Sequence, residues 1–252
     1  MNVLFILMLL VIGIIVGVSG TGSFLYAPLA IFFLSFDIRQ AIIIALGSYV
    51  IITGGGLLLN KKNRKIHRHV VFAHVAAAFP GVLAGQIFNF YISKQALILC
   101  FALILLGMVI TILFESSSKH TGHSIPIKHH QRQNLLVLSA FAGGFLTGFV
   151  GIGGAVVTIP VMICLGYDPK ISITTSSASA VLYGLLAFTL HSFLIKVSPL
   201  LVFSVGFLGF LSSQMASHLL FFIDREVSRR LISLFILVSV FYLIFHAYNL
   251  SY

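Results

Sequence analysis

Residues 17–28 of the chain, GVSGTGSFLYAP, decide the fold. A second stretch of the same character, GFVGIGGAVVTIP, occupies residues 148–160. Each is a cluster of glycines inside a long apolar run that a proline closes. Glycine has no Cβ and adopts positive φ freely, so such clusters indicate places where a helix unwinds. We call residues 17–28 the first glycine break and residues 148–160 the second glycine break.

The composition indicates an integral membrane protein. Apolar residues make up 59% of the 252 residues, charged residues only 8%, and the mean hydropathy is +1.12. A soluble domain is usually about 25% charged. The net charge of +10 would suggest nucleic acid as a partner of a soluble protein. In a membrane chain it indicates cytoplasmic loops instead, so we expect a lipid bilayer and no nucleic acid.

The chain divides into two halves of matching order. Each half has two short apolar arms around its glycine break, then an acidic corner, Asp37-Ile38-Arg39 or Asp168-Pro169-Lys170, then three longer apolar segments. The sequence therefore predicts an all-α polytopic protein of two repeats, each a glycine-broken hairpin followed by three transmembrane helices. The predicted parts are a first repeat at 1–114, a polar linker at 115–133 and a second repeat at 134–252. The predicted arms are 3–17, 24–36, 134–148 and 155–166, and the predicted spans are 40–59, 70–92, 95–114, 171–195, 199–223 and 231–248.

The positive charges favour an inverted relation between the repeats. If each glycine break crosses the membrane once, the repeats are parallel and six of the fifteen Lys and Arg residues lie outside. If each break is a hairpin that returns to its starting side, the repeats are inverted. Only Arg39, Lys94 and Lys196 of the fifteen then lie outside. Lys and Arg gather on the cytoplasmic side, so we predict inverted repeats with both termini outside.

The paired breaks resemble the signature of the TauE/SafE family of membrane permeases. The segments GTGSFLYAP and GIGGAVVTIP, each about nine residues before an acidic corner, carry the resemblance, together with Gly81, Gly85 and Gly209. It covers nearly the whole chain. It implies a transporter of a small sulfur-containing anion such as sulfite or an organosulfonate. Nothing in the sequence resembles a catalytic nucleophile with its base, so we expect no enzyme and no cofactor.

The two breaks are the candidate binding site. Helices that resume near Gly22 and Gly154 would point free N–H groups and positive dipole ends at an anion. The alternative is that the glycines only allow close helix packing, which we favour for the pairs Gly13/Gly17 and Gly144/Gly148. The side-chain amides of Gln86 and Gln214 occupy matching positions in the two halves. They either donate hydrogen bonds to the anion or form hydrogen bonds between helices. The candidate substrate-binding residues are Ser19, Gly20, Thr21, Gly22, Ser23, Gly151, Ile152, Gly153, Gly154, Gln86 and Gln214.

The acidic residues restrict the charge of the substrate. All five lie at span ends or in loops, whereas a cation carrier normally keeps a carboxylate at depth. A neutral or anionic substrate follows. His74 could relay protons, but we favour a histidine that hydrogen-bonds a neighbouring backbone for His74, His191 and His218. For the loop histidines His120, His123, His129 and His130 we favour a solvated linker and predict no metal site.

We therefore expect an anion permease of the cytoplasmic (inner) membrane that works by alternating access between its repeats. The alternative is a membrane scaffold or assembly protein in which the glycines serve as packing surfaces. The sequence also allows a homodimer, and it leaves the coupling ion and the direction of transport open.

Overall fold

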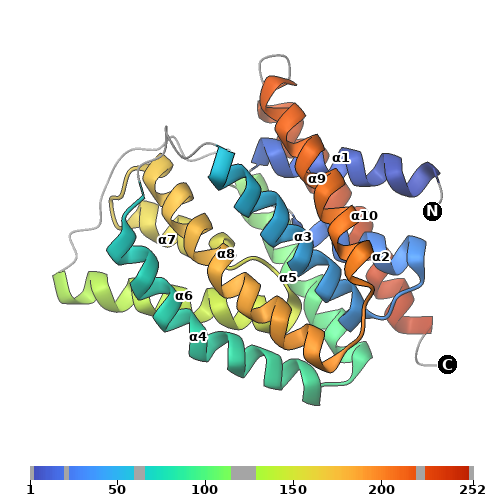
Figure 1. The fold of residues 1–252 in the computed structure, drawn as a ribbon, viewed down its shortest axis with the longest axis horizontal. Coiled ribbons are helices and arrows are strands. Elements are labelled where there is room, and N and C mark those ends of the chain that lie inside the picture. The colour runs from blue at the N-terminus through green and yellow to red at the C-terminus, as the bar shows by residue number, and fades with distance from the viewer. Residues whose placement is uncertain (1–2, 20–22, 60–65, 115–128, 220–224, 250–252) are drawn as a thin grey trace.

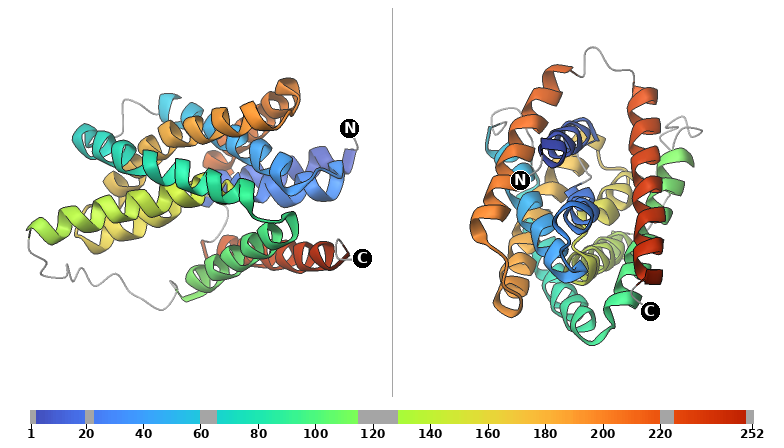
Figure 2. Two further views of the ribbon diagram at one scale, coloured as in Figure 1. Left: turned by 90° about the horizontal axis from the view of Figure 1, so that it is seen from below. Right: turned by 90° about the vertical axis from the view of Figure 1, so that its right-hand side faces the viewer.

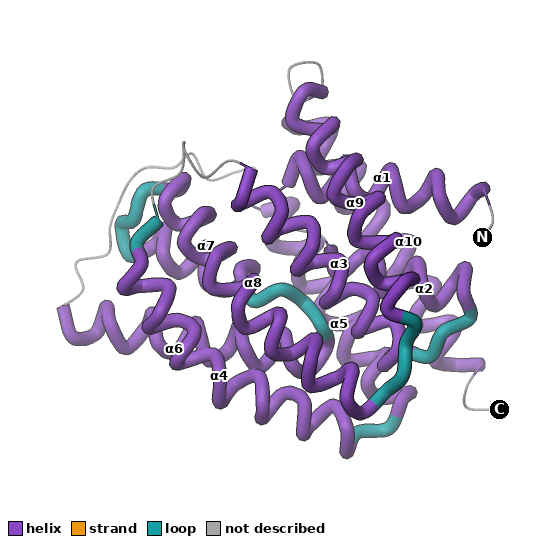
Figure 3. The backbone as a smooth tube through the Cα atoms, in the orientation of Figure 1, coloured by secondary structure: helices purple, strands orange, loops and turns teal. Residues whose placement is uncertain are grey.

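The structure, a computed structural model, describes residues 3–19, 23–59, 66–114, 129–219 and 225–249. These residues form a bundle of helices and contain no strand (Figures 1 and 3). The all-helical fold expected from the sequence is therefore confirmed. The helices are α1 (Val3–Ser19), the 3₁₀ helix η1 (Ser23–Leu25), α2 (Tyr26–Leu34), α3 (Ile38–Leu59), α4 (Arg68–Tyr91), α5 (Lys94–Phe114), α6 (His129–Val150), α7 (Ala155–Cys164), α8 (Pro169–Leu194), α9 (Pro199–Leu219) and α10 (Arg225–Asn249).

Five helices within the described residues are long and apolar enough to cross a membrane: α3, α4, α6, α8 and α9. α3, α4 and α8 match the predicted spans to within two residues at either end. α6 does not match the short arm predicted at 134–148. It has 22 residues, roughly 33 Å at 1.5 Å per residue. The helix begins at His129, inside the predicted linker, because the polar residues before 134 continue the helix beyond its apolar part. Residues 115–128 lie outside the described part.

The two halves of the chain exchange helices. α4 of the first half packs on α6 and α8 of the second half, and α9 of the second half packs on α1 and α3 of the first. α3 and α8 occupy equivalent places in the two halves, and they pack on each other. Figure 1 shows these two helices running through the middle of the bundle. Each half therefore completes the other half's core.

Close contacts give the relative directions of these helices. Gly47 of α3 faces Phe188 of α8, and Gly54 faces Val181, so α3 and α8 run antiparallel. By contrast, Gly81 of α4 lies against Phe141 and Phe145 of α6, while Gly85 lies against Phe145 and Phe149, so α4 and α6 run parallel.

Small residues bring α4 and α6 into backbone contact. A Cβ on Gly85 would collide with the carbonyl oxygen of Phe145, and one on Gly148 would collide with that of Val82. Gly144 lies against Ala78 in the same way. The packing role expected for Gly144 and Gly148 is confirmed. Gly13 of α1 has the corresponding role against Ser212 of α9.

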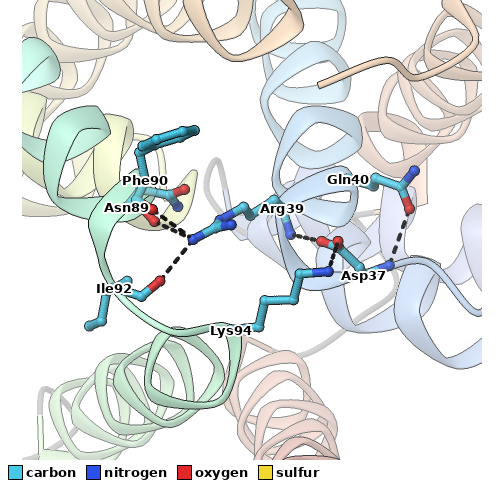
Figure 4. A network of polar contacts seen from close by, with 7 residues as sticks. All are labelled: Asp37, Arg39, Gln40, Asn89, Phe90, Ile92 and Lys94. Atoms are coloured by element: carbon cyan, nitrogen blue, oxygen red, sulfur yellow. Dashed lines mark hydrogen bonds and ion pairs between the residues drawn. The ribbon is translucent and has the colours of Figure 1, made fainter. Parts of the chain in front are cut away.

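The first acidic corner is a polar network that joins three helices (Figure 4). Asp37 accepts the N–H of Arg39 at 2.7 Å, and Gln40 accepts the N–H of Asp37 at 3.3 Å, which is a reciprocal cap of α3. Lys94, the first residue of α5, forms an ion pair with Asp37 at 2.7 Å. Burial raises the pKa of Asp37, but hydrogen bonds from Lys94 and from backbone N–H groups outweigh it and leave that pKa below its ordinary value.

Arg39 ties the same corner to the end of α4. Its Nη2 donates to the carbonyl oxygens of Asn89, Phe90 and Ile92 at 3.0, 3.0 and 2.8 Å (Figure 4). These carbonyls carry the negative end of the helix dipole, so the guanidinium is a C-terminal cap. Asp168 caps α8 in the equivalent corner of the second half by accepting the N–H groups of Lys170 and Ile171.

The last helices of the two halves form a separate pair. α5 and α10 pack on each other along one flank of the bundle (Figure 2). This pair contacts α1 and α3, and the described residues give it no comparable contact with α6 or α8. A pocket of about 290 Å³ lies between the pair and α2, beside Asp37, Tyr242 and His246.

The glycine contacts predict a clear asymmetry between two Gly→Leu substitutions. We expect Gly148→Leu to lower the free energy of unfolding by about 3 kcal/mol, because the backbone of α4 blocks the new side chain. Gly107 of α5 has no heavy atom within 4 Å of the point that a Cβ would occupy, so Gly107→Leu should leave stability nearly unchanged. Denaturation of the detergent-solubilised protein measures both. Equal stability of the two variants would contradict the backbone contact between α4 and α6.

The corner predicts a pH-dependent stability difference. Asp37→Ala should cost about 1–2 kcal/mol near neutral pH, since the cap contributes about 1 kcal/mol and the half-exposed ion pair a fraction of that. The pKa of Asp37 is lowered on folding, so its charge stabilises above the ordinary value of 3.8 and this contribution is lost as pH falls through the lowered pKa. Asp37→Asn should therefore be less stable than wild type at neutral pH but not in strong acid.

Asp168→Asn is the matched control for this experiment. Asparagine can still cap α8, and within the described residues Asp168 has no ion pair like that of Asp37. We expect Asp168→Asn to lower the denaturation midpoint at neutral pH less than Asp37→Asn does, because it removes no ion pair with a lysine. Losses of equal size in the two variants would assign the effect of Asp37 to capping instead of to Lys94.

Candidate functional site

The second glycine break forms the turn of a hairpin between α6 and α7, near the middle of the bundle. α6 ends at Val150, and α7 begins at Ala155. Gly151 has φ +73°, a conformation that favours glycine, and it turns the chain back on itself. Gly153 lies against Tyr49, near the middle of α3, and Gly154 lies against Tyr183, near the middle of α8. The helix therefore resumes at mid-depth of the two central spans.

The two arms of this hairpin differ in length. The side-chain amide of Asn89 donates to the carbonyl oxygen of Phe149 at 2.6 Å, so α6 reaches almost as far as the end of α4. α7 has only 10 residues. The predicted pair of short arms is thus wrong for α6 and right for α7. The N-terminus of α7 lies at Gly154, as the sequence predicts.

Thr147 holds the break in shape. Its hydroxyl oxygen lies 2.7 Å from the carbonyl oxygen of Gly143 and 2.9 Å from that of Ile152, and it accepts the N–H of Gly154 at 3.0 Å. One fully buried hydroxyl therefore links α6, the loop and the start of α7. The carbonyl of Gly154 in turn receives the N–H of Thr158 at 3.2 Å and its hydroxyl at 3.3 Å.

Three backbone donors in the break have no acceptor. Within the described part of the chain, no hydrogen bond uses the N–H groups of Ile152, Gly153 or Ala155. Residues 151–155 are all buried. Unpaired buried N–H groups are rare in proteins, and free N–H groups at a helix N-terminus are the kind of donor that binds anions.

Two tyrosines lie against the glycines of the break. The ring of Tyr49 would lie 2.7 Å from a Cβ on Gly153, and the hydroxyl of Tyr183 would contact one on Gly154. Both side chains are buried. Thr53 lies beside the hydroxyl of Tyr49 and Thr158 beside that of Tyr183, yet neither tyrosine completes a hydrogen bond of normal geometry. The break thus joins unpaired N–H groups to unpaired hydroxyls.

The first glycine break is described only at its edges. Ser19 is the last residue of α1, and Ser23 is the first residue of η1. Gly20, Thr21 and Gly22 lie outside the described residues. α2 follows at once, and the hydroxyl of Tyr26 lies unpartnered against Gly209 of α9. Here too a helix resumes after the glycines, beside α3.

The two matching glutamines are not brought together. Gln86 is buried in α4, which packs on α6 and α8. Gln214 lies in α9, beside Gly56 of α3 and Ser213. Each occupies the C-terminal part of its helix, away from the mid-depth position of the second break.

The histidines divide into two kinds. His191 lies 2.8 Å from the carbonyl oxygen of Gly148 through its Nε2, as predicted for a histidine that bonds a neighbouring backbone. His74 is buried, and neither ring nitrogen has a partner, so that prediction is wrong for His74. The side chain of His218 lies outside the described part.

Sequence reasoning missed Thr147, Tyr49 and Tyr183. A threonine one turn before the end of a helix, or a tyrosine within an apolar span, is ordinary in a membrane helix. One signal was present in the sequence: Tyr49 and Tyr183 each place a hydroxyl near the middle of an apolar span, α3 and α8. Tyr49 meets the break through the packing of the two halves and Tyr183 through the folding of α7 onto α8, and the sequence reveals neither contact.

Helices that break and resume at mid-depth of neighbouring spans are typical of membrane transporters. The family model for the sulfite exporter TauE/SafE matches residues 5–243, a range that includes both glycine breaks. The chain therefore belongs to the sulfite exporter TauE/SafE family and is a membrane transporter. No curated protein and no solved structure is significantly similar to it.

The bonds of Thr147 predict that its hydroxyl is structural. We expect Thr147→Val to lower the free energy of unfolding by about 1–3 kcal/mol, because valine keeps the shape but leaves the N–H of Gly154 buried and unpaired. Thr189→Val is the control, since Thr189 is exposed and its hydroxyl bonds only within its own helix. Denaturation in detergent compares the two. A Thr147→Val variant as stable as Thr189→Val would contradict this role.

Proposed function

We propose that the chain is a permease for small sulfur-containing anions, such as sulfite or organosulfonates, in the cytoplasmic membrane. Family membership supports the transporter class. The main observation in favour of an anionic substrate is that, among the described residues, the N–H groups of Ile152, Gly153 and Ala155 are unpaired in a buried break. All five acidic residues of the sequence lie outside the middle of the spans, which argues against a cation.

The proposed binding site has two parts. The second glycine break, from Gly151 to Gly154, supplies backbone donors, and residues 19–23 of the first break would supply the matching donors and hydroxyls. α2 packs on α3, and the loop of the second break lies against Ile42 and Tyr49 of the same helix, which supports a shared location. Gln86 and Gln214 would act on the paths that lead to the site from the two sides, since each lies toward one end of its helix.

The mechanism we propose is alternating access between inverted repeats. α3 and α8 are equivalent helices, and their antiparallel packing supports an inverted relation. Parallel repeats would require equivalent helices to point the same way. The charge count of the loops supports the same topology, with both termini outside. One repeat would then move against the other around a site at mid-depth.

Flux into liposomes tests the site. We expect purified wild-type protein to transport sulfite or a small sulfonate and Gly153→Leu to lose at least about 90% of that flux, because the new side chain would displace Tyr49 from the break. Gly107→Leu is the matched control and should keep wild-type flux. Size-exclusion chromatography checks that each variant is folded. Equal flux in both variants would contradict the assignment of the site.

The same liposomes separate the permease from a scaffold. A scaffold that uses its glycines for packing would show no flux in the wild type, while Gly153→Leu would change its state of assembly.

Accessibility of charged tags fused to the two termini tests the topology. Tags that are both reached from outside the cell support inverted repeats, and tags on opposite sides contradict them.

A further inference from the structure

We propose that Tyr49 and Tyr183 complete the anion site through their hydroxyl groups, and that this site selects a singly charged anion over a doubly charged one. Hydrogen sulfite or an alkyl sulfonate would be transported, and the sulfite dianion or sulfate would not. The inference rests on the proposed function and names the charge of the substrate and two residues that determine it.

The geometry places both tyrosines against the two glycines that precede α7. A Cβ on Gly153 would lie 2.8 Å from the Cζ atom of Tyr49, which carries the hydroxyl, and a Cβ on Gly154 would collide with the hydroxyl of Tyr183. The two tyrosines come from α3 and α8, which pack on each other, so they enclose the break from two sides. Donors from three separate elements therefore meet at the N-terminus of α7.

Both hydroxyls are buried without a partner, which is costly in the resting protein. Tyr49 is 4% exposed and Tyr183 is 0% exposed. A buried polar group that lacks a hydrogen bond is uncommon, and phenylalanine would pack equally well at either position without that cost. An anion between the hydroxyls and the N–H groups would satisfy all of them at once. The unpaired groups thus mark a ligand position instead of a packing role.

Every donor at this position is uncharged. N–H and O–H dipoles attract an anion in proportion to its charge, whereas the cost of removing the anion from water grows with the square of that charge. Doubling the charge therefore doubles the attraction but raises the desolvation cost about fourfold. A site of neutral donors at mid-depth in a membrane accordingly favours a single charge, unless a cation lies in contact with it.

The described charged groups around the break do not supply that cation. Arg39 of α3 is the nearest cation along that helix, and its Nη2 already binds three carbonyl oxygens at the end of α4. His191 of α8 is engaged with Gly148, and His74 of α4 is buried without a partner. α7 carries no titratable side chain apart from Cys164 at its far end. The other charges of α4, α6 and α8 lie in their first turns, including Arg68, Arg132 and Lys170.

A series of substrates tests the charge selection in liposomes that hold the purified full-length protein at a clamped membrane potential. Methanesulfonate carries one charge at every pH used and should be transported at a rate that does not change with pH. Sulfate should show less than about one tenth of that flux. Sulfite flux should fall roughly tenfold for each pH unit above the pKa of hydrogen sulfite, because the singly charged form then disappears.

Methanesulfonate also controls for titration of the protein. If His74 or His191 governed the pH dependence, methanesulfonate flux would change with pH as sulfite flux does, and the charge inference would be overturned. Sulfate flux equal to that of methanesulfonate would overturn it as well and leave the permease intact. Absence of flux for all three anions would instead contradict the proposed function itself.

Tyrosine-to-phenylalanine variants test the two residues. Tyr49→Phe and Tyr183→Phe keep the ring and remove only the hydroxyl, so we expect each to raise the KM for methanesulfonate roughly tenfold or more while the protein stays folded. Tyr91→Phe is the matched control because Tyr91 is 82% exposed at the end of α4. Thermal unfolding in detergent should show no loss of stability in any of the three. An unchanged KM in both site variants would overturn the assignment of the tyrosines.

Discussion

The structure depends on one constraint: main-chain polar groups away from water must find a partner inside the protein. The helices of the bundle satisfy their own groups, and the second glycine break is the place where a described helix stops doing so. Thr147 pairs the N–H of Gly154, while the N–H groups of Ile152, Gly153 and Ala155 find no acceptor among the residues that the structure describes. The protein tolerates these groups because two long spans cover the break on either side. The surrounding helices can therefore be understood as a way to keep an unsatisfied segment buried.

The close packing of small residues follows from the same requirement. α4 and α6 approach so closely that a Cβ on Gly85 or Gly148 would collide with a carbonyl oxygen of the facing helix. Van der Waals packing of this kind is the main source of helix association in lipid, where burial of apolar surface gives little. The glycine contacts between α4 and α6 therefore help to keep the break buried, since looser packing of these two helices would expose its N–H groups.

The sequence predicted the elements well and their partners poorly. Hydropathy located the spans and glycine located the start of α7, because both are local properties of the chain. The length of α6 was missed, since polar residues from His129 onward can extend a helix past its apolar part. Tyr49 and Tyr183 could not be assigned to the break, because their neighbours come from the other half of the chain or from distant loops. Clustered glycines located the second break in the sequence, and the positive φ of Gly151 gives the physical reason for one of them. Gln86 and Gln214 match in sequence but lie on α4 and α9, which are separate parts of the bundle.

The exchange of helices between the halves has a consequence for how such a protein can be divided. A chain of half this length would make its own equivalent of α4 or α9 but would lack the helices on which that element packs. Such a fragment would expose the apolar faces that α6, α8 or α1 and α3 cover in the full chain. Cutting the chain between its halves therefore removes the packing partners of both pieces, and only their reassociation restores the bundle.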